Sequence, residues 1–271
     1  MLLLEPGHTA YDLHFRVLGI PVRVHPMFWL VTAIMGFQEL NARSQGLARF
    51  AIWVGCVFFS ILIHEMGHVI MGRLCGRDGK IVLYAFGGLA IPDRHLYNRW
   101  QRIAVSFAGP LAQFLLIAVL ALVIILPNHE NSEPLLNMLR HMFGLELEPN
   151  TFLDMPALVQ VLVWDMLFIN IFWAVLNLLP IWPLDGGQIS KDLLDGARPG
   201  GQGVRTAYGI SLVVAALLTI HCIAGANEKK FIPFLPMFGS IFSALLFGSL
   251  AVESWQLLQQ ERNPPWRRED W

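Results

Sequence analysis

Two histidines and a glutamate stand together in one of the most apolar stretches of the chain, ILIHEMGHVI at residues 61–70. If this stretch is helical, His64 and His68 lie about 40° apart around the helix axis and present two ring nitrogens on one face. Glu65 lies about 100° away, within reach of a water molecule on a metal ion. This HExxH pattern predicts two zinc ligands and one general base.

The apolar surroundings strengthen this interpretation. AIWVGCVFFS precedes the motif and VIMG follows its last histidine. A Glu or His buried in a membrane helix costs on the order of a few kcal/mol unless it is paired or coordinated. A polar trio that only faces the interior of a helix bundle would leave that cost without compensation, so we favour metal coordination.

A catalytic zinc site needs a third protein ligand and one position for water. A later apolar segment ends in NLLPIWPLDGGQIS, residues 177–190, where Pro180 and Pro183 break the helix and Asp185 follows. This segment runs in the same direction as the one with the histidines, so Asp185 is predicted at their depth. Asp165 is the rival ligand, but it lies near the far end of its segment. We therefore predict Asp185 as the third ligand.

The composition indicates a polytopic membrane protein. Hydrophobic residues make up 55% of the chain and charged residues 14%, whereas soluble domains carry roughly 25% charged residues. The net charge of −1 and the lack of a long Lys/Arg block argue against a nucleic-acid partner.

The fold class predicted is an all-α polytopic membrane protein of about six transmembrane helices, with a small β-like cytoplasmic or re-entrant element. About 20 apolar residues are needed for each span. The six apolar segments lie at about 26–41, 47–73, 102–126, 157–180, 206–224 and 231–258.

Two stretches between these segments look like strands. Residues 11–26 are rich in Val and Ile around a turn, and residues 78–93 alternate loosely around Gly87 and Gly88. We interpret the second stretch as a strand pair that dips toward the membrane. The predicted organisation is a cytoplasmic β-like segment (1–25), a membrane core (26–258) and a short cytoplasmic tail (259–271).

The distribution of positive charge predicts the orientation. With six spans, fourteen of the 19 Lys and Arg residues fall on the side that carries both termini. Because positively charged loops stay in the cytoplasm, both termini are predicted there, with the active site toward the same side. The membrane is expected to be a bacterial or archaeal plasma membrane.

HEMGH followed by NLLPIWPLDGG resembles the site-2 protease family of intramembrane metalloproteases. The family signatures are HExxH and an N-x-x-P-x-x-P-x-D-G-like stretch, and a Gly-Pro pair in the intervening span appears here as Gly109-Pro110. The resemblance covers about residues 11–258. It implies a zinc-dependent endopeptidase with one Zn²⁺ per chain, held by His64, His68 and Asp185, with Glu65 as the general base.

The resemblance also implies that Asn177 positions the substrate; the alternative is a polar bond inside the helix bundle. Gly87 and Gly88 would allow a substrate strand to approach closely, or they only form a turn. Gln113 stands where the family often has Asn, and we assign it no role. His25 is expected to be an interfacial or capping side chain.

The expected partners are the lipid bilayer and a single-span membrane protein substrate. The resemblance implies regulated intramembrane proteolysis, and clearance of signal-peptide remnants is the alternative. No PDZ-like insertion and no nucleotide-sensing domain are evident, so the resemblance is to a minimal core. Two alternatives are a zinc transporter, which would spread its ligands along a path, and a non-catalytic relative that binds membrane helices. The clustered ligands and the presence of Glu65 favour hydrolysis over both.

Overall fold

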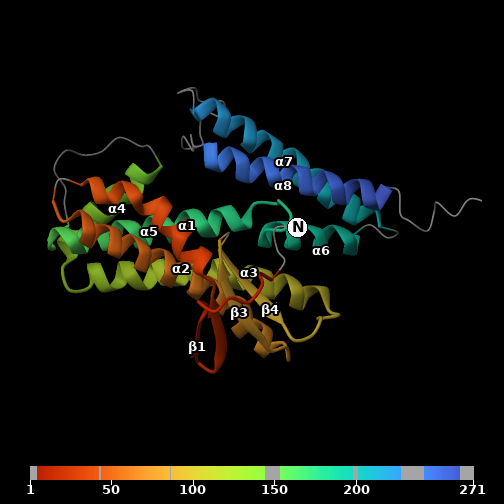
Figure 1. The fold of residues 1–271 in the computed structure, drawn as a ribbon, viewed down its shortest axis with the longest axis horizontal. Helices are drawn as coiled ribbons and strands as arrows, with labels where there is room; N and C mark the ends of the chain where they lie inside the picture. The colour runs from red at the N-terminus through yellow and green to blue at the C-terminus, as the bar shows by residue number, and fades with distance from the viewer. Residues whose placement is uncertain are drawn as a thin grey trace, which may run out of the picture. The chain divides into compact units, whose positions relative to one another are not determined.

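The computed structural model describes residues 5–42, 44–85, 87–143, 153–197, 201–226 and 241–262. Within these residues the protein is mostly helical and contains one four-stranded sheet (Figure 1). The chain divides into two compact units. The N-terminal unit comprises Leu2–Leu96 with Ala108–Val175, and the C-terminal unit comprises Tyr97–Phe107 with Leu176–Trp271.

Four helices in the described residues are long and apolar enough to cross a membrane. They are α2 (Gly46–Leu74), α3 (Arg99–Ile125), α5 (Ala157–Leu178) and most of α7 (Gln202–Ala226). These helices match the second to fifth apolar segments of the sequence. The prediction of a multi-span helical protein is therefore supported for these four segments.

The predicted count of six spans is not confirmed. The first segment forms helix α1 (Pro26–Gly36), followed by the 3₁₀ helix η1 (Phe37–Asn41). The 11 residues of α1 rise about 16 Å, roughly half the thickness of a bilayer core. The sixth segment lies partly outside the described residues, and its described part belongs to helix α8 (Ile241–Arg262).

Both β-like stretches form hairpins, and the two hairpins share one sheet. β1 (Leu13–Val17) pairs with β2 (Ile20–Val24), and β3 (Gly79–Tyr84) pairs with β4 (Gly87–Pro92), both antiparallel. β2 and β3 join the hairpins as a parallel pair, so the strand order is β1-β2-β3-β4. The long helix α2 provides the crossover that parallel neighbours require.

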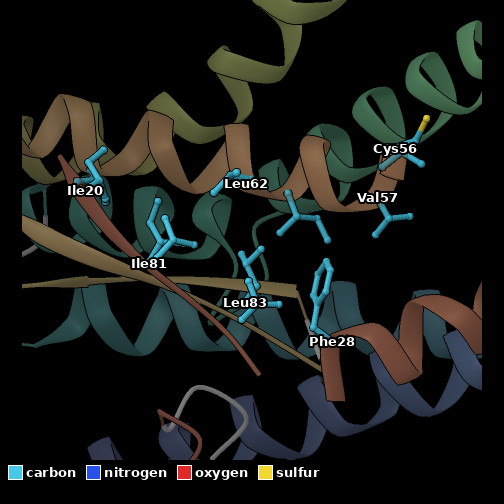
Figure 2. Packing of buried hydrophobic residues seen from close by; sticks show 12 residues of the cluster. Ile20, Phe28, Cys56, Val57, Leu62, Ile81 and Leu83 are labelled. Carbon is cyan, nitrogen blue, oxygen red and sulfur yellow. The ribbon is translucent and has the colours of Figure 1, made fainter. Parts of the chain in front are cut away.

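The core of the N-terminal unit lies between this sheet and the helices α1 and α2. Figure 2 shows side chains of β2, β3, α1 and α2 in one apolar layer, among them Ile20, Leu83, Phe28 and Leu62. Ile20 and Leu83 are fully buried. This packing holds β3 and β4 against α2, the helix that carries the HExxH motif. Along the chain, η2 (His129–Asn131) and α4 (Ser132–Met142) lie between α3 and α5.

The C-terminal unit is built on α6 (Asp185–Ala197), α7 and α8. α7 and α8 lie side by side (Figure 1), and α6 packs against α7. Arg102, on the first turn of α3, makes a two-pronged ion pair with Asp192 of α6, with its Nη2 atom 2.7 Å from Oδ1. Such bidentate pairs fix orientation as well as distance.

A buried arginine ties the segment before β1 to the sheet. Arg23 of β2 is 5% exposed, and its guanidinium lies 3.0 Å from both Asp12 Oδ2 and Glu5 Oε1. Lys80 of β3 contacts the same Glu5 oxygen at 2.7 Å. Hydrogen bonds from Thr9, reinforced by Arg23, lower the pKa of Asp12 to about 2. The hydrogen bond from Lys80 also lowers the pKa of Glu5.

Because Asp12 and Glu5 tie the segment before β1 to the sheet through their charged carboxylates, we predict that this segment detaches from the sheet in acid. Because folding lowers both pKa values, their stabilising contribution is present above the unfolded-state pKa values of about 4 and is lost as the pH falls through the folded values. Protection factors of the amides at residues 5–12, measured by hydrogen exchange, should hold at pH 5 and fall toward pH 2. Asp12→Asn should reduce protection already at pH 7. Unchanged protection between pH 5 and pH 2 would contradict this account.

Candidate metal centre

The two histidines of the HExxH motif meet on one face of α2, as their spacing predicts. His64 Nε2 and His68 Nε2 lie 3.1 Å apart, and the ring planes cross at 85°. Both residues and Glu65 are buried. One face of α2 therefore presents two imidazole nitrogens next to a buried carboxyl group.

Close helix packing surrounds the histidines. A Cβ atom at Gly109 of α3 would run into His68 Nε2 and His64 Cε1, and a Cβ at Gly67 of α2 would run into the Ala108 carbonyl. The two helix backbones can approach only because both positions lack side chains. The Gly-Pro pair noted in the sequence thus forms one wall of the histidine site.

On its other ring nitrogen, His64 contacts a side chain that the sequence analysis left without a role. Nδ1 of His64 lies 3.0 Å from Oε1 of Gln113, a residue of α3 with no exposed surface. Gln113 in turn contacts Asn170 of α5. The signal for both was present in the sequence, since each is a carboxamide inside an apolar span, but pattern alone did not show what they contact.

The Glu65 side chain lies next to the beginning of β4. A Cβ atom at Gly88 would overlap the Glu65 side chain, and one at Gly87 would overlap the Trp173 ring. Gly87 also has a φ of 117°, a backbone conformation that disfavours side chains. The structure thus places Gly88 beside the predicted general base and Gly87 beside the Trp173 ring.

The outer edge of β4 is free of any further strand in the described part of the chain. Asp93 N donates to Asp78 O, and hydrogen-bonded pairs alternate along an antiparallel ladder. Counting along the register from the hydrogen-bonded Asp78–Asp93 pair, every second pair lacks mutual hydrogen bonds. These pairs include Leu83–Gly88 and Ile81–Ala90. The backbone N–H and C=O groups of Gly88 and Ala90 therefore face outward. An open hydrogen-bonding edge begins beside Glu65.

Asp185 is the first residue of α6 in the C-terminal unit, and it is buried. The chain reverses sharply before it, with Ile181 N donating to Leu179 O at 2.7 Å and Leu184 N to Ile181 O at 2.8 Å. A Cβ at Gly186 would collide with the Leu178 carbonyl. This compact turn after the proline break holds Asp185 on a defined backbone.

The turn is also held from α7 and α8. Trp182 N donates to Ser211 Oγ at 2.7 Å, and Ser211 contacts Ser254 at 2.7 Å. Asn177, near the end of α5, is buried in the same unit. The structure brings His64, Glu65, His68, Gly87 and Gly88 together in the N-terminal unit, whereas Asn177 and Asp185 belong to the C-terminal unit, and their part in the site stays a prediction.

The histidine pair fits a zinc ion. Two nitrogens at about 2.0–2.1 Å from a tetrahedral zinc lie about 3.3 Å apart, close to the observed 3.1 Å between the Nε2 atoms. The rival ligand Asp165 is buried on α5, but among the described residues it does not group with the two histidines within 4.8 Å. His25 caps the N-terminus of α1, where its Nδ1 accepts from Met27 N at 3.2 Å, as predicted.

Comparison with known proteins identifies the family. The model of peptidase family M50 matches residues 52–220, which is more than half of the chain and includes both sequence signatures. The chain belongs to peptidase family M50. This confirms the family that the HExxH and NLLPIWPLDGG stretches resemble.

Several named proteins are similar to this M50 member. A zinc metalloprotease of Methanocaldococcus jannaschii is 23% identical over 215 residues, covering 79% of this chain and 54% of that protein. Stage IV sporulation protein FB of Bacillus subtilis is 28% identical over 203 residues, covering 73% and 56%. A Synechocystis protein is 28% identical over 206 residues, covering 72% and 48%. The chain spans about half the length of the curated relatives it matches.

The fold is that of a solved relative. The structure of a site-2 protease from Methanocaldococcus jannaschii superposes with a TM-score of 0.52, covering 91% of this chain and 94% of that one, at 20% sequence identity. At this identity the likeness establishes the fold alone. The M50 chain thus combines the family's fold with the HExxH geometry described above.

Substitution of Gly109 tests the close packing of α3 against the rings of His64 and His68. Gly109→Ala should abolish or strongly weaken metal binding, because the added methyl group occupies the space of the two imidazole rings. Gly55→Ala on α2 is the matched control, since its Cβ meets no atom within 4 Å, and it should bind metal normally. Metal bound per chain, measured by elemental analysis on purified protein, gives the readout. Normal metal content in Gly109→Ala would contradict the packing described here.

Proposed function

We propose that this M50 family member is a zinc-dependent intramembrane endopeptidase. The observation that carries the proposal is the paired Nε2 atoms of His64 and His68 beside Glu65, which itself lies at the open edge of β4. A pair of histidine nitrogens for one metal ion, a general base and a strand edge in one unit suit the hydrolysis of an extended peptide. The relative from Methanocaldococcus jannaschii carries the name zinc metalloprotease, which supports the same chemistry.

In this proposal His64, His68 and Asp185 hold one zinc ion. Zinc bound there would acidify a water molecule and polarise the scissile carbonyl. Glu65 accepts the proton of the attacking water and delivers it to the leaving amine. Burial of Glu65 beside Gly88 keeps its carboxyl group next to the backbone edge on which a substrate would lie.

The assignment of Asp185 rests on its donor type and its setting. A catalytic zinc site takes three protein ligands, and His₂ with one carboxylate is an established set. Asp185 is a buried carboxylate on a turn fixed by tight backbone hydrogen bonds. Burial disfavours a charged carboxylate unless it is paired or coordinates a metal ion, and metal coordination is the role proposed here for Asp185.

Substrate is proposed to add as a strand to β4. The outward N–H and C=O groups of Gly88 and Ala90 provide main-chain hydrogen bonds, as in other cases of β-augmentation. A transmembrane helix must unwind before its peptide bonds are accessible, and pairing with β4 would stabilise the unwound segment. Asn177 is proposed to position the substrate by hydrogen bonding.

The chain is proposed to lie in a plasma membrane with six spans, from 26 to 258, and both termini in the cytoplasm. Four helices in the described residues meet the length and polarity of a span, and the bias of Lys and Arg supports the proposed orientation. The substrate is proposed to be a single-span membrane protein, and the reaction to be regulated intramembrane proteolysis. Residues 1–25 and 259–271 would flank this core in the cytoplasm.

The site assignment predicts distinct behaviour for base and ligand variants. Glu65→Gln should retain one zinc per chain and lose cleavage by about 10²–10⁴-fold, since a neutral amide takes no proton. Asp185→Ala should lose zinc, while Asp195→Ala, at an exposed position of the same helix, should keep it. The measurements are elemental analysis and cleavage of a panel of single-span model substrates. Full zinc in Asp185→Ala would show that the third ligand is another residue.

The edge of β4 gives an independent prediction on substrate binding. Ala90→Pro removes one outward N–H and leaves the pairing of β4 with β3 intact, because proline is tolerated at such edge positions. The loss of one hydrogen bond, worth about 1 kcal/mol, should lower cleavage efficiency about fivefold at unchanged zinc content. Ala90→Val keeps the N–H and should cleave normally. Equal activity in the two variants would rule out strand addition at this edge.

A further inference from the structure

A chain of buried polar groups leads away from His64 on the side opposite the proposed metal. His64 Nδ1 contacts Gln113 Oε1 at 3.0 Å, and Gln113 Nε2 contacts Asn170 Oδ1 at 3.3 Å. Asn170 Nδ2 contacts Ser60 Oγ at 2.8 Å and the Met166 backbone oxygen at 2.7 Å. Gln113, Asn170 and Ser60 have no exposed surface, and they come from three different helices, α3, α5 and α2.

The Met166 carbonyl determines which group donates and which accepts in each hydrogen bond of this series. A backbone carbonyl oxygen can only accept a hydrogen bond, so the Asn170 group that faces it is the NH₂. The Asn170 oxygen therefore faces Gln113 and requires the Gln113 NH₂ as its donor. The Gln113 oxygen is then left facing His64, and among the contacts of the described residues its donor is an N–H on Nδ1 of His64.

The consequence for the site is a defined tautomer. With its hydrogen on Nδ1, neutral His64 carries its lone pair on Nε2, the atom 3.1 Å from His68 Nε2. A ligand histidine whose second nitrogen donates to a fixed acceptor is held in one ring orientation and binds metal more strongly. The donor and acceptor roles in the whole series of hydrogen bonds are thus fixed by a helix carbonyl, which cannot rotate as a side-chain amide can.

We propose that Gln113 and Asn170 are positioning residues that hold His64 as the Nδ1–H tautomer, with its Nε2 lone pair aimed at the metal. The inference rests on the proposed function, in which His64 is a zinc ligand. Neither residue touches the reacting atoms in this role, and both act through the His64 ring. Ser60 accepts from Asn170 but does not set the direction, because the Met166 carbonyl already does.

The test is metal affinity in the full chain, purified in detergent, measured by competition between the protein and a chelator for zinc. Gln113→Met has a similar shape and no acceptor for His64, and Asn170→Leu removes the link to the Met166 carbonyl. Each should weaken zinc binding by about 10–100-fold. The double variant should bind zinc about as tightly as the more strongly affected single variant, because both substitutions interrupt the same series of hydrogen bonds.

Two further variants separate positioning from general packing. Gln113→Glu retains an oxygen facing His64 and should bind zinc within a few-fold of the wild type. Ser60→Ala, the matched control at an equally buried position, should bind zinc like the wild type. The absorption spectrum of bound Co²⁺ should change in Gln113→Met and Asn170→Leu and stay unchanged in Ser60→Ala, since it reports ligand geometry and not fold stability.

The outcomes distinguish this inference from the proposed function. If the wild type binds no zinc, or His64→Ala binds it equally well, the proposed metal site itself is wrong. If His64→Ala loses zinc while Gln113→Met binds it as tightly as the wild type with the same Co²⁺ spectrum, the positioning role is wrong and the metal site stands. Equal losses in Gln113→Met and Gln113→Glu would also overturn the positioning role, because the acceptor oxygen would then have no effect.

Discussion

The burial of two imidazoles and a carboxyl group in an apolar helix is the constraint on which the rest of the N-terminal unit depends. Each of these groups is costly in a low-polarity setting unless it has a partner. The structure provides partners in layers: the two histidines face each other, Gln113 supports one ring, and Asn170 supports Gln113. Every layer is itself polar and buried, so the network is stable only when it is complete.

Close approach of backbones is the second requirement, and glycine meets it. Gly109 lets α3 pass beside the imidazoles, Gly67 lets α2 pass beside α3, and Gly88 lets β4 reach Glu65. At each of these positions a single methyl group would displace an element or a side chain of the site. The small residues around the motif therefore determine the shape of the site as much as the polar residues determine its chemistry.

The sheet and the helix that bears the motif depend on each other. α2 is the crossover between two parallel strands, and its apolar side packs on β2 and β3 in the core shown in Figure 2. As a result, the strand hairpin that follows α2 folds back along the same helix and brings its outer edge to Glu65. The open edge of β4, where an extended peptide is proposed to bind, thus arises from packing that also stabilises the fold.

The sequence by itself determined the features that depend on local spacing. Positions i and i+4 place His64 and His68 on one helical face, the apolar segments match the long helices within one to four residues at most ends, and His25 before Pro26 forms a helix cap. The family also follows from two short signatures, HExxH and NLLPIWPLDGG, as the M50 match confirms. These features need only neighbouring residues and a known helical period.

Only the tertiary structure decided which distant groups meet. The sequence predicted two separate β-like stretches, but their union into one sheet depends on a crossover of more than 50 residues. No local pattern links Gln113, Asn170 and Ser60 to His64, because their contacts join three different helices. The tautomer proposed for His64 depends on the Met166 carbonyl of α5, a backbone atom whose position cannot be read from residue types.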